Sequence, residues 1–288
     1  MVSILSYNRQ EKGLEMPTIV RTMFEDYVKE SFNIEDCIAV CNGTCALIAV
    51  LFSLDLQPGD EVIVTPFTFI ASTNAILLAG AKPVFVDIKP GSLLIDETKI
   101  EEAITERTRA IMPVHLFGRI CQMTEIMNIA RKHNLAVIED TAQAFGAVDA
   151  HGRDAGMIGD AGTFSFYKTK NISTFEGGMI CIPKHSILDA EKIRSICDQG
   201  QQGKYNHVHL GFNFRLAEPL CLMAHEQMKL HMTGVRAELG LRGPENGHYP
   251  RVVYDQPIYK KMGIQGNCPV AERVTTEIRE GLYQYETC

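Results

Sequence analysis

The sequence lacks the features that would assign the protein to a nucleic-acid-binding or membrane class. It contains no block of basic residues and its formal net charge is −7, which argues against nucleic acid as the main partner. Its longest apolar run, residues 45–54, is too short to span a bilayer. The first residues lack a charged leader followed by a long apolar core, so we expect no export signal and no association with a membrane.

Paired cysteine motifs are also absent. The nine cysteines are odd in number, scattered, and include no Cys-x-x-Cys pair, which indicates reduced thiols and a cytoplasmic location. Cys37, Cys41 and Cys45 are evenly spaced, but a turn is expected between a strand and a helix there. Because no histidine lies nearby with ligand spacing, we expect no metal site.

What the sequence does contain is an alternation of short apolar strands and apolar-periodic helices. The 288 residues are 45% hydrophobic, enough for one large domain and a smaller one. Strands are predicted at 38–41, 61–65, 83–86, 110–114 and 136–138, and helices at 17–33, 45–54, 70–79, 100–104, 123–133, 184–196 and 217–230. This pattern predicts an α/β fold with a mainly parallel sheet and helices on both faces. Ligands of such sheets bind beyond the carboxyl ends of the strands.

Lys170 lies in the most informative stretch. An apolar run from Thr163 precedes a polar turn that holds Lys168 and Lys170, and Gly177-Gly178 opens a second apolar run. A strand, an exposed loop and a second strand would hold an amine at the edge of a buried sheet. That position suits a lysine that must lose its proton and attack a carbonyl. The alternative is a surface loop with two ordinary solvated lysines.

Three further features precede Lys170 in the chain. Gly43-Thr44 at a strand-to-helix junction would offer backbone N–H groups to a phosphate, although a plain N-cap explains the same pattern. Asp140 ends a strand and is either a buried acid with a cationic partner or a helix cap, and Phe69 is a stacking or a core residue. Together with Lys170, these features form the set that pyridoxal 5′-phosphate needs. The set is a lysine amine, a phosphate cradle, a ring platform and a carboxylate for the ring nitrogen.

Several motifs in order resemble the DegT-type sugar aminotransferases. The resemblance spans residues 18–230 and is carried by residues 42–47, 58–64, 67–75, 80–88, 113–118, 137–147, 164–178 and 211–215. It implies the aspartate aminotransferase fold: the fold type I large domain of pyridoxal-phosphate-dependent transferases, a three-layer αβα structure with a mainly parallel seven-stranded sheet. The implied domains are a cofactor-binding large domain, residues 1–230, and a truncated small domain, residues 231–288.

The resemblance also implies roles for single residues. Lys170, directly before Asn171, would hold the cofactor covalently and shuttle a proton, and this position excludes the competing Lys168. Asp140 would pair with the pyridinium nitrogen, and Gln143 would lie near the ring hydroxyl. The remaining implied cofactor contacts are Phe69 on the ring, Gly43, Thr44 and Ser165 on the phosphate, and Asn213 on the phosphate of a neighbouring subunit. His115 and Glu176 are expected either to orient the site or to have a structural role.

The implied reaction is transamination in amino-sugar biosynthesis. Glutamate would donate its amino group and leave as 2-oxoglutarate, and a keto sugar nucleotide or a related cyclic keto-polyol would receive it. Because Asn213 would act across subunits, the active unit would be a homodimer with shared active sites.

The C-terminal part departs from this family pattern. After Leu230 the sequence passes almost directly to residues 235–239. Relative to the family pattern, we expect a block of about eighty or more residues to be missing there. Two alternatives therefore stay open: a catalytically impaired remnant or regulatory paralogue that binds the cofactor, and a pyridoxal-phosphate-dependent sugar dehydratase. The second is disfavoured because such relatives carry histidine where this chain has Lys170.

Overall fold

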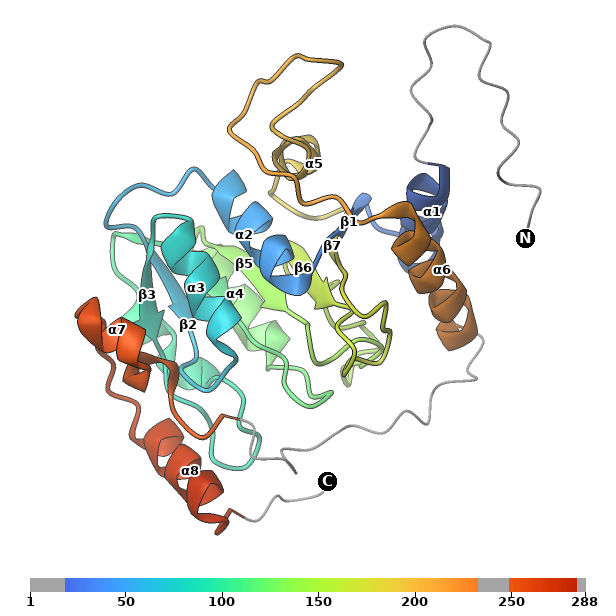
Figure 1. Ribbon diagram of the computed structural model, residues 1–288. Helices are drawn as coiled ribbons and strands as arrows, with labels where there is room; N and C mark the ends of the chain where they lie inside the picture. The colour runs from blue at the N-terminus through green and yellow to red at the C-terminus, as the bar shows by residue number, and fades with distance from the viewer. Residues whose placement is uncertain (1–18, 233–248, 284–288) are drawn as a thin grey trace, which may run out of the picture.

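The computed structural model describes residues 19–232 and 249–283, in which helices cover both faces of a central sheet (Figure 1). The strands are β1 (Asp36–Val40), β2 (Glu61–Val64), β3 (Lys82–Phe85), β4 (Thr108–Met112), β5 (Ala136–Asp140), β6 (Ala161–Ser165) and β7 (Gly178–Ile182). The helices are α1 (Ile19–Phe32), α2 (Gly43–Ser53), α3 (Ile70–Leu78), α4 (Met123–His133), α5 (Ala190–Cys197), α6 (Glu218–Met232), α7 (Pro257–Lys261) and α8 (Pro269–Glu280).

The sheet is seven-stranded and mainly parallel, as predicted. Its order is β1-β7-β6-β5-β4-β2-β3, and within the described residues only β7 runs antiparallel to its neighbours. Because β6 and β7 are antiparallel, the loop that joins them, residues 166–177, stays at the carboxyl edge of β6. Lys170 therefore lies at the same edge as the ends of β4 and β5, where ligands of such sheets bind.

Alternation along β1 shows how the apolar sequence builds the core on both faces of the sheet. Ile38 and Val40 belong to the larger buried cluster, together with residues of α2. Cys37 and Ala39 point the other way, into a second cluster that α1 and α6 complete. Side chains of successive strand residues lie on opposite faces, so residues 37–40 of β1 supply apolar side chains to both clusters.

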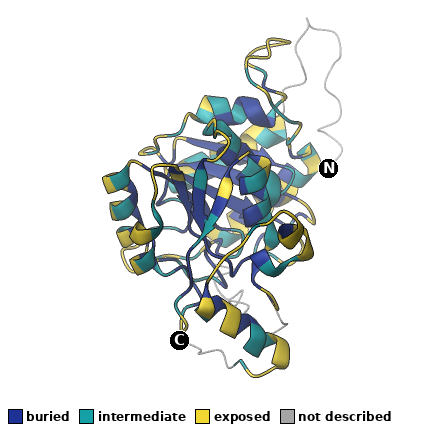
Figure 2. Ribbon diagram, turned by 90° about the vertical axis from the view of Figure 1, so that its left-hand side faces the viewer, coloured by how far each residue is buried: buried dark blue, intermediate teal, exposed yellow. Residues whose placement is uncertain are grey.

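The helices differ in how deeply they are buried. Figure 2 shows buried strands in the interior and exposed turns on the outer helices. In α4 the buried residues are Met123, Ile126, Met127 and Ala130, the spacing of a one-sided amphipathic helix. Helices α1 and α6 lie side by side at the end of the sheet near β1 (Figure 1).

Two predicted helices differ from the structure. The helix expected at 184–196 begins only at Ala190, because the Asp189 carboxylate accepts a hydrogen bond from the Lys192 N–H at 3.1 Å and caps the helix there. The weak helix expected at 100–104 consists of two short 3₁₀ turns, Glu97–Lys99 and Glu101–Ala103.

Residues 249–283 pack against the sheet domain near β3 (Figure 1). The two Asp87 carboxylate oxygens accept the N–H groups of Val270 and Ala271 at the start of α8, both at 2.9 Å. A carboxylate at a helix N-terminus is stabilising. The division of the chain at residue 230 stays a prediction, and residues 235–239 lie outside the described part. Among the described helices, none has the length and apolar character needed to cross a membrane.

Candidate functional site

A cavity of about 570 Å³ lies at the carboxyl ends of the central strands. Its lining comes from the junction after β1, the segments after β2, β4 and β5, the end of β6, and the loop before β7. It brings together seven of the eight residues predicted as site residues: Gly43, Thr44, Phe69, Asp140, Gln143, Ser165 and Lys170.

Lys170 is the lysine of the loop that enters the cavity. Its backbone N–H donates to the Tyr167 carbonyl at 2.8 Å, and its side chain is half-buried. Burial lowers the pKa of the Lys170 amine, and the nearby charge of Asp140 opposes this shift only in part. Lys168 is exposed, and its ammonium lies 5.7 Å from the centre of the Tyr167 ring. The two lysines therefore have different environments, and only Lys170 is desolvated.

Asp140 ends β5 and is fixed by two hydrogen bonds. One carboxylate oxygen accepts from the Ser72 hydroxyl at 2.7 Å, and the other accepts from the Ala142 N–H at 3.2 Å. The Ser72 hydroxyl also contacts the Thr68 hydroxyl at 2.8 Å, so the two hydroxyls and the carboxylate form a buried chain. Sequence reasoning assigned no role to Ser72. Its place in the first turn of the predicted helix 70–79, four residues after Thr68, was the available signal.

Gly43 and Thr44 lie in the first turn of α2, where backbone N–H groups have no partner within the helix. The Asn42 side chain caps this helix and accepts from the Cys45 N–H at 2.8 Å. A Cβ placed on Gly43 would lie 2.9 Å from the Ser165 Cβ, so only glycine allows this close approach. The glycine thus lets the start of α2 approach Ser165 closely, and both line the cavity, which suits a phosphate.

Phe69 and Gln143 also line the cavity. Phe69 precedes α3 and leaves 61% of its surface exposed, so its ring is available to a planar ligand. The Gln143 amide donates a hydrogen bond to the Tyr249 hydroxyl. Burial and the charge of Asp140 raise the pKa of Tyr249 above its usual range, so this hydroxyl stays protonated. Sequence reasoning assigned no role to Tyr249, because 106 residues separate it from Gln143.

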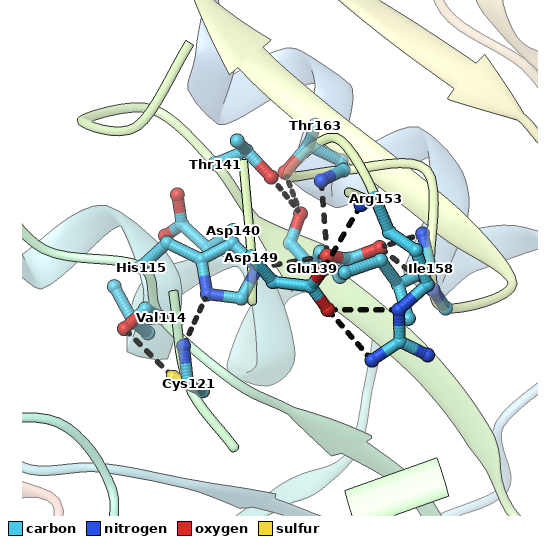
Figure 3. Close-up of polar contacts among 12 residues, drawn as sticks. Val114, His115, Cys121, Glu139, Asp140, Thr141, Asp149, Arg153, Ile158 and Thr163 are labelled. Carbon is cyan, nitrogen blue, oxygen red and sulfur yellow. Dashed lines mark hydrogen bonds and ion pairs between the residues drawn. The ribbon is translucent and has the colours of Figure 1, made fainter. Parts of the chain in front are cut away.

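A buried pair, His115 and Glu139, lies beside the cavity, and Figure 3 shows its polar contacts. His115 and Glu139 are fully buried, and His115 Nε2 lies 2.8 Å from a Glu139 oxygen. His115 Nδ1 accepts from the Cys121 N–H at 3.2 Å, so Nε2 carries the proton that is donated to Glu139. Glu139 also accepts the N–H groups of Gly156, Ile158 and Gly159. These contacts favour a structural role for the pair.

Glu176 and Asn213 differ from the central set. Glu176 is exposed and lines the cavity near its mouth. Asn213 is exposed, forms a bridge with Asp198, and is not among the residues that line the cavity of this chain. Its predicted contact with a neighbouring subunit stays a prediction.

The lining fits pyridoxal phosphate by the chemistry of its groups. A desolvated amine, a doubly hydrogen-bonded carboxylate, helix N–H donors beside a hydroxyl, and an exposed aromatic ring share one cavity. Each of these groups meets one requirement of the cofactor.

Comparison with known proteins identifies the family. A sequence profile described as the DegT/DnrJ/EryC1/StrS aminotransferase family matches residues 16–237. A GDP-perosamine synthase of Caulobacter vibrioides is 45% identical over 195 residues, which are 67% of this chain and 52% of that protein. A protein of Geobacillus stearothermophilus named pleiotropic regulatory protein is 48% identical over 178 residues, 62% of this chain and 47% of that protein.

A solved structure agrees with these matches. The structure of Spr1654 of Streptococcus pneumoniae in its PLP-form, described as a sugar aminotransferase, has a TM-score of 0.69 and 26% sequence identity to this chain. The match covers 74% of this chain and 60% of that one. The chain spans about half the length of the curated relatives named above. The extent of the profile match nevertheless shows that the chain belongs to the DegT/DnrJ/EryC1/StrS aminotransferase family.

Proposed function

We propose that the cavity binds pyridoxal 5′-phosphate and that the protein transfers an amino group from glutamate to a keto sugar nucleotide. The observation that carries this proposal is the half-buried Lys170 amine, which shares the cavity with Asp140. When bound, pyridoxal phosphate supplies an aldehyde that condenses with amines and a ring that withdraws electrons from the adjacent carbon.

Lys170 supplies the amine and the proton transfers. Because burial lowers its pKa, a larger fraction of the amine is neutral near pH 7 than for a solvated lysine. A neutral amine can attack a carbonyl carbon, and it can later accept and return a proton at the substrate carbon.

Asp140 supplies a fixed negative charge. Ser72 and the Ala142 N–H hold its two oxygens, so the carboxylate does not need to reorganise when a protonated ring nitrogen lies against it. Gly43, Thr44 and Ser165 would hold the phosphate, Phe69 would lie against the ring, and Gln143 would lie near the ring hydroxyl.

The substrate class follows from the relatives. One is named GDP-perosamine synthase, and the solved neighbour is described as a sugar aminotransferase. We infer a nucleotide-linked keto sugar as acceptor and amino-sugar biosynthesis as the context. A homodimer is part of this proposal, because the exposed Asn213 is available to a second copy of the chain.

A second candidate function is regulatory. The relative from Geobacillus stearothermophilus is named a pleiotropic regulatory protein, and its 48% identity is in the same range as that of the synthase. In this reading the chain binds the cofactor without turning over a sugar. A dehydratase is not favoured, because Lys170 occupies the position that would hold histidine.

The test is an absorbance titration of the purified chain with pyridoxal phosphate, followed by glutamate. We expect a visible band in the wild type and in Lys168→Ala, and no such band in Lys170→Ala. Glutamate should shift the band and release 2-oxoglutarate in stoichiometric amount. A band that does not respond to glutamate would favour the regulatory candidate, and no band in the folded wild type would refute cofactor binding.

A further inference from the structure

Two thiols flank the start of α2 beside the cavity. Eight cysteines lie in the part of the chain that the structure describes, and six of them are buried. The two that are partly exposed are Cys41, directly after β1, and Cys45, in the first turn of α2. Cys45 also lines the cavity.

Local folding places these two residues in one turn, on either side of Asn42. The Asn42 carbonyl accepts from the Ala46 N–H at 3.1 Å, which turns the chain from strand into helix within residues 41–46. The Asn42 amide lies 3.8 Å from the Cys41 sulfur, while its oxygen accepts from the Cys45 N–H at 2.8 Å. One asparagine therefore contacts both cysteines.

The two thiols have different acidities. A hydrogen bond from the Cys45 thiol lowers the pKa of Cys41 to about 7, although partial burial opposes this shift. The same interaction raises the pKa of Cys45, so its thiol stays protonated. A thiolate next to a protonated thiol is the arrangement of an attacking and a resolving cysteine.

We propose that Cys41 and Cys45 are a site of oxidative modification that reacts with low-molecular-weight disulfides and closes into an intramolecular disulfide. The Cys41 thiolate attacks one sulfur of glutathione disulfide, forms a mixed disulfide, and releases glutathione thiolate, which takes up a proton. The Cys45 sulfur then attacks the Cys41 sulfur, loses its proton to solvent, and releases the second glutathione. Two protein thiols are oxidised and one glutathione disulfide is reduced to two thiols.

The modification is coupled to the cavity through the helix start. A bond between the two sulfurs would pull on Asn42, whose oxygen caps the same turn that presents the Gly43 and Thr44 N–H groups. Loss of an N-cap hydrogen bond corresponds to about a fivefold change in an equilibrium constant. This coupling rests on the proposed cofactor site, whereas the thiol chemistry does not.

The acidity of Cys41 sets the expected rate. With a pKa of about 7, roughly half of the Cys41 thiol is ionised at pH 7, against roughly 3% of an ordinary thiol with a pKa near 8.5. The less basic sulfur is about fivefold less nucleophilic, so we expect Cys41 to react about threefold faster than an exposed ordinary thiol at pH 7. Its rate should level off just above pH 7 rather than near pH 8.5.

The first measurement treats the native chain with glutathione disulfide and maps the products by mass spectrometry after alkylation of free thiols. We expect a disulfide that joins Cys41 to Cys45. The six buried cysteines should stay reduced and should become alkylated only after the chain is unfolded. The Cys45→Ser variant should trap glutathione on Cys41 as a mixed disulfide. In the Cys41→Ser variant, the remaining Cys45 thiol should react only slowly with glutathione disulfide. A different pairing, no disulfide, or a rate that still rises above pH 8 would overturn the proposal.

The second measurement titrates pyridoxal phosphate into the reduced and the oxidised chain. We expect the Kd of the oxidised chain to be about fivefold higher, with reduction by dithiothreitol restoring the original value. Glutathione disulfide should not change the Kd of the Cys41→Ser/Cys45→Ser double variant. An equal Kd in both redox states would refute the coupling. If neither state binds the cofactor, the proposed function fails, and the mass-spectrometric result still decides the thiol chemistry.

Discussion

The substitution Glu139→Gln tests how the buried carboxylate stabilises the turn before β6. In the native chain one Glu139 oxygen accepts the N–H groups of Ile158 at 2.8 Å and Gly159 at 2.7 Å. The other oxygen accepts from Gly156 N–H at 2.9 Å and lies 2.8 Å from His115 Nε2. Burial would raise the pKa of Glu139, but its hydrogen bonds with His115 and the backbone lower it, so the group is ionised at neutral pH.

The magnitude follows from the count of donors. Glutamine has the same shape, but one of its oxygens becomes an NH₂ group that can only donate. In the better orientation the amide oxygen keeps two donors, and the other two face the NH₂ group. If His115 changes tautomer to accept there, its Nδ1–H then opposes the Cys121 N–H. Two buried polar groups without partners cost about 1–3 kcal/mol each, so we expect a loss of about 4 kcal/mol in the free energy of unfolding.

The assay is urea-induced unfolding at pH 7, followed by circular dichroism. The matched control is Glu102→Gln, which removes the same charge from an exposed position and should change the free energy of unfolding by less than about 0.5 kcal/mol. A loss below about 1 kcal/mol for Glu139→Gln would show that the hydrogen-bonded carboxylate is not what stabilises this turn.

The same substitution predicts a pH dependence. A carboxyl whose pKa is depressed in the folded state stabilises the fold above its unfolded pKa, about 4.3 for glutamate, and loses this contribution as the pH falls further. The difference between wild type and Glu139→Gln should therefore be present above about pH 5 and shrink below about pH 4. A difference that grows on acidification would contradict this sign.

Three further predictions concern other contacts. Asn42→Ala removes the N-cap of α2 and should cost about 1 kcal/mol in urea unfolding, and no measurable loss would contradict the capping contact. Gly43→Ala places a Cβ 2.9 Å from the Ser165 Cβ, so the free energy of unfolding should fall by about 1–3 kcal/mol and the Kd for pyridoxal phosphate should rise; unchanged values would refute the close approach. Arg194→Met leaves Glu25 and Asp36 without their shared cation and should cost about 3 kcal/mol at pH 7, less near pH 4, and an equal loss at both values would argue against the ion pairs.

The layered fold could be predicted from the sequence because its strands are buried on both faces. β1, β5 and β7 are buried at every position, and their residues are mainly apolar. The charged exceptions stand at strand ends: Asp36 opens β1, and Glu139 and Asp140 close β5.

The predicted start of α5 at residue 184 was wrong. Ile187 and Leu188 extend the apolar pattern before the helix, but the N-cap at Asp189 makes the helix begin at Ala190. The spacing of apolar residues alone does not distinguish a helix from the turn before it.

The candidate site was only partly predictable. Residues at strand ends and helix starts, such as Asp140 and Gly43, have local signals, and parallel topology brings them to one edge. Ser72 and Tyr249 enter through tertiary contacts with Asp140 and Gln143, across 68 and 106 residues. A single sequence carries no local pattern for contacts of that range.

The central claim is that Lys170 is the amine that binds the cofactor. The most direct measurement is to incubate the chain with pyridoxal phosphate, reduce the covalent adduct with borohydride, and locate the label by peptide mapping. We expect one label per chain, on Lys170. A label on Lys168, or one spread over several exposed lysines, would contradict it.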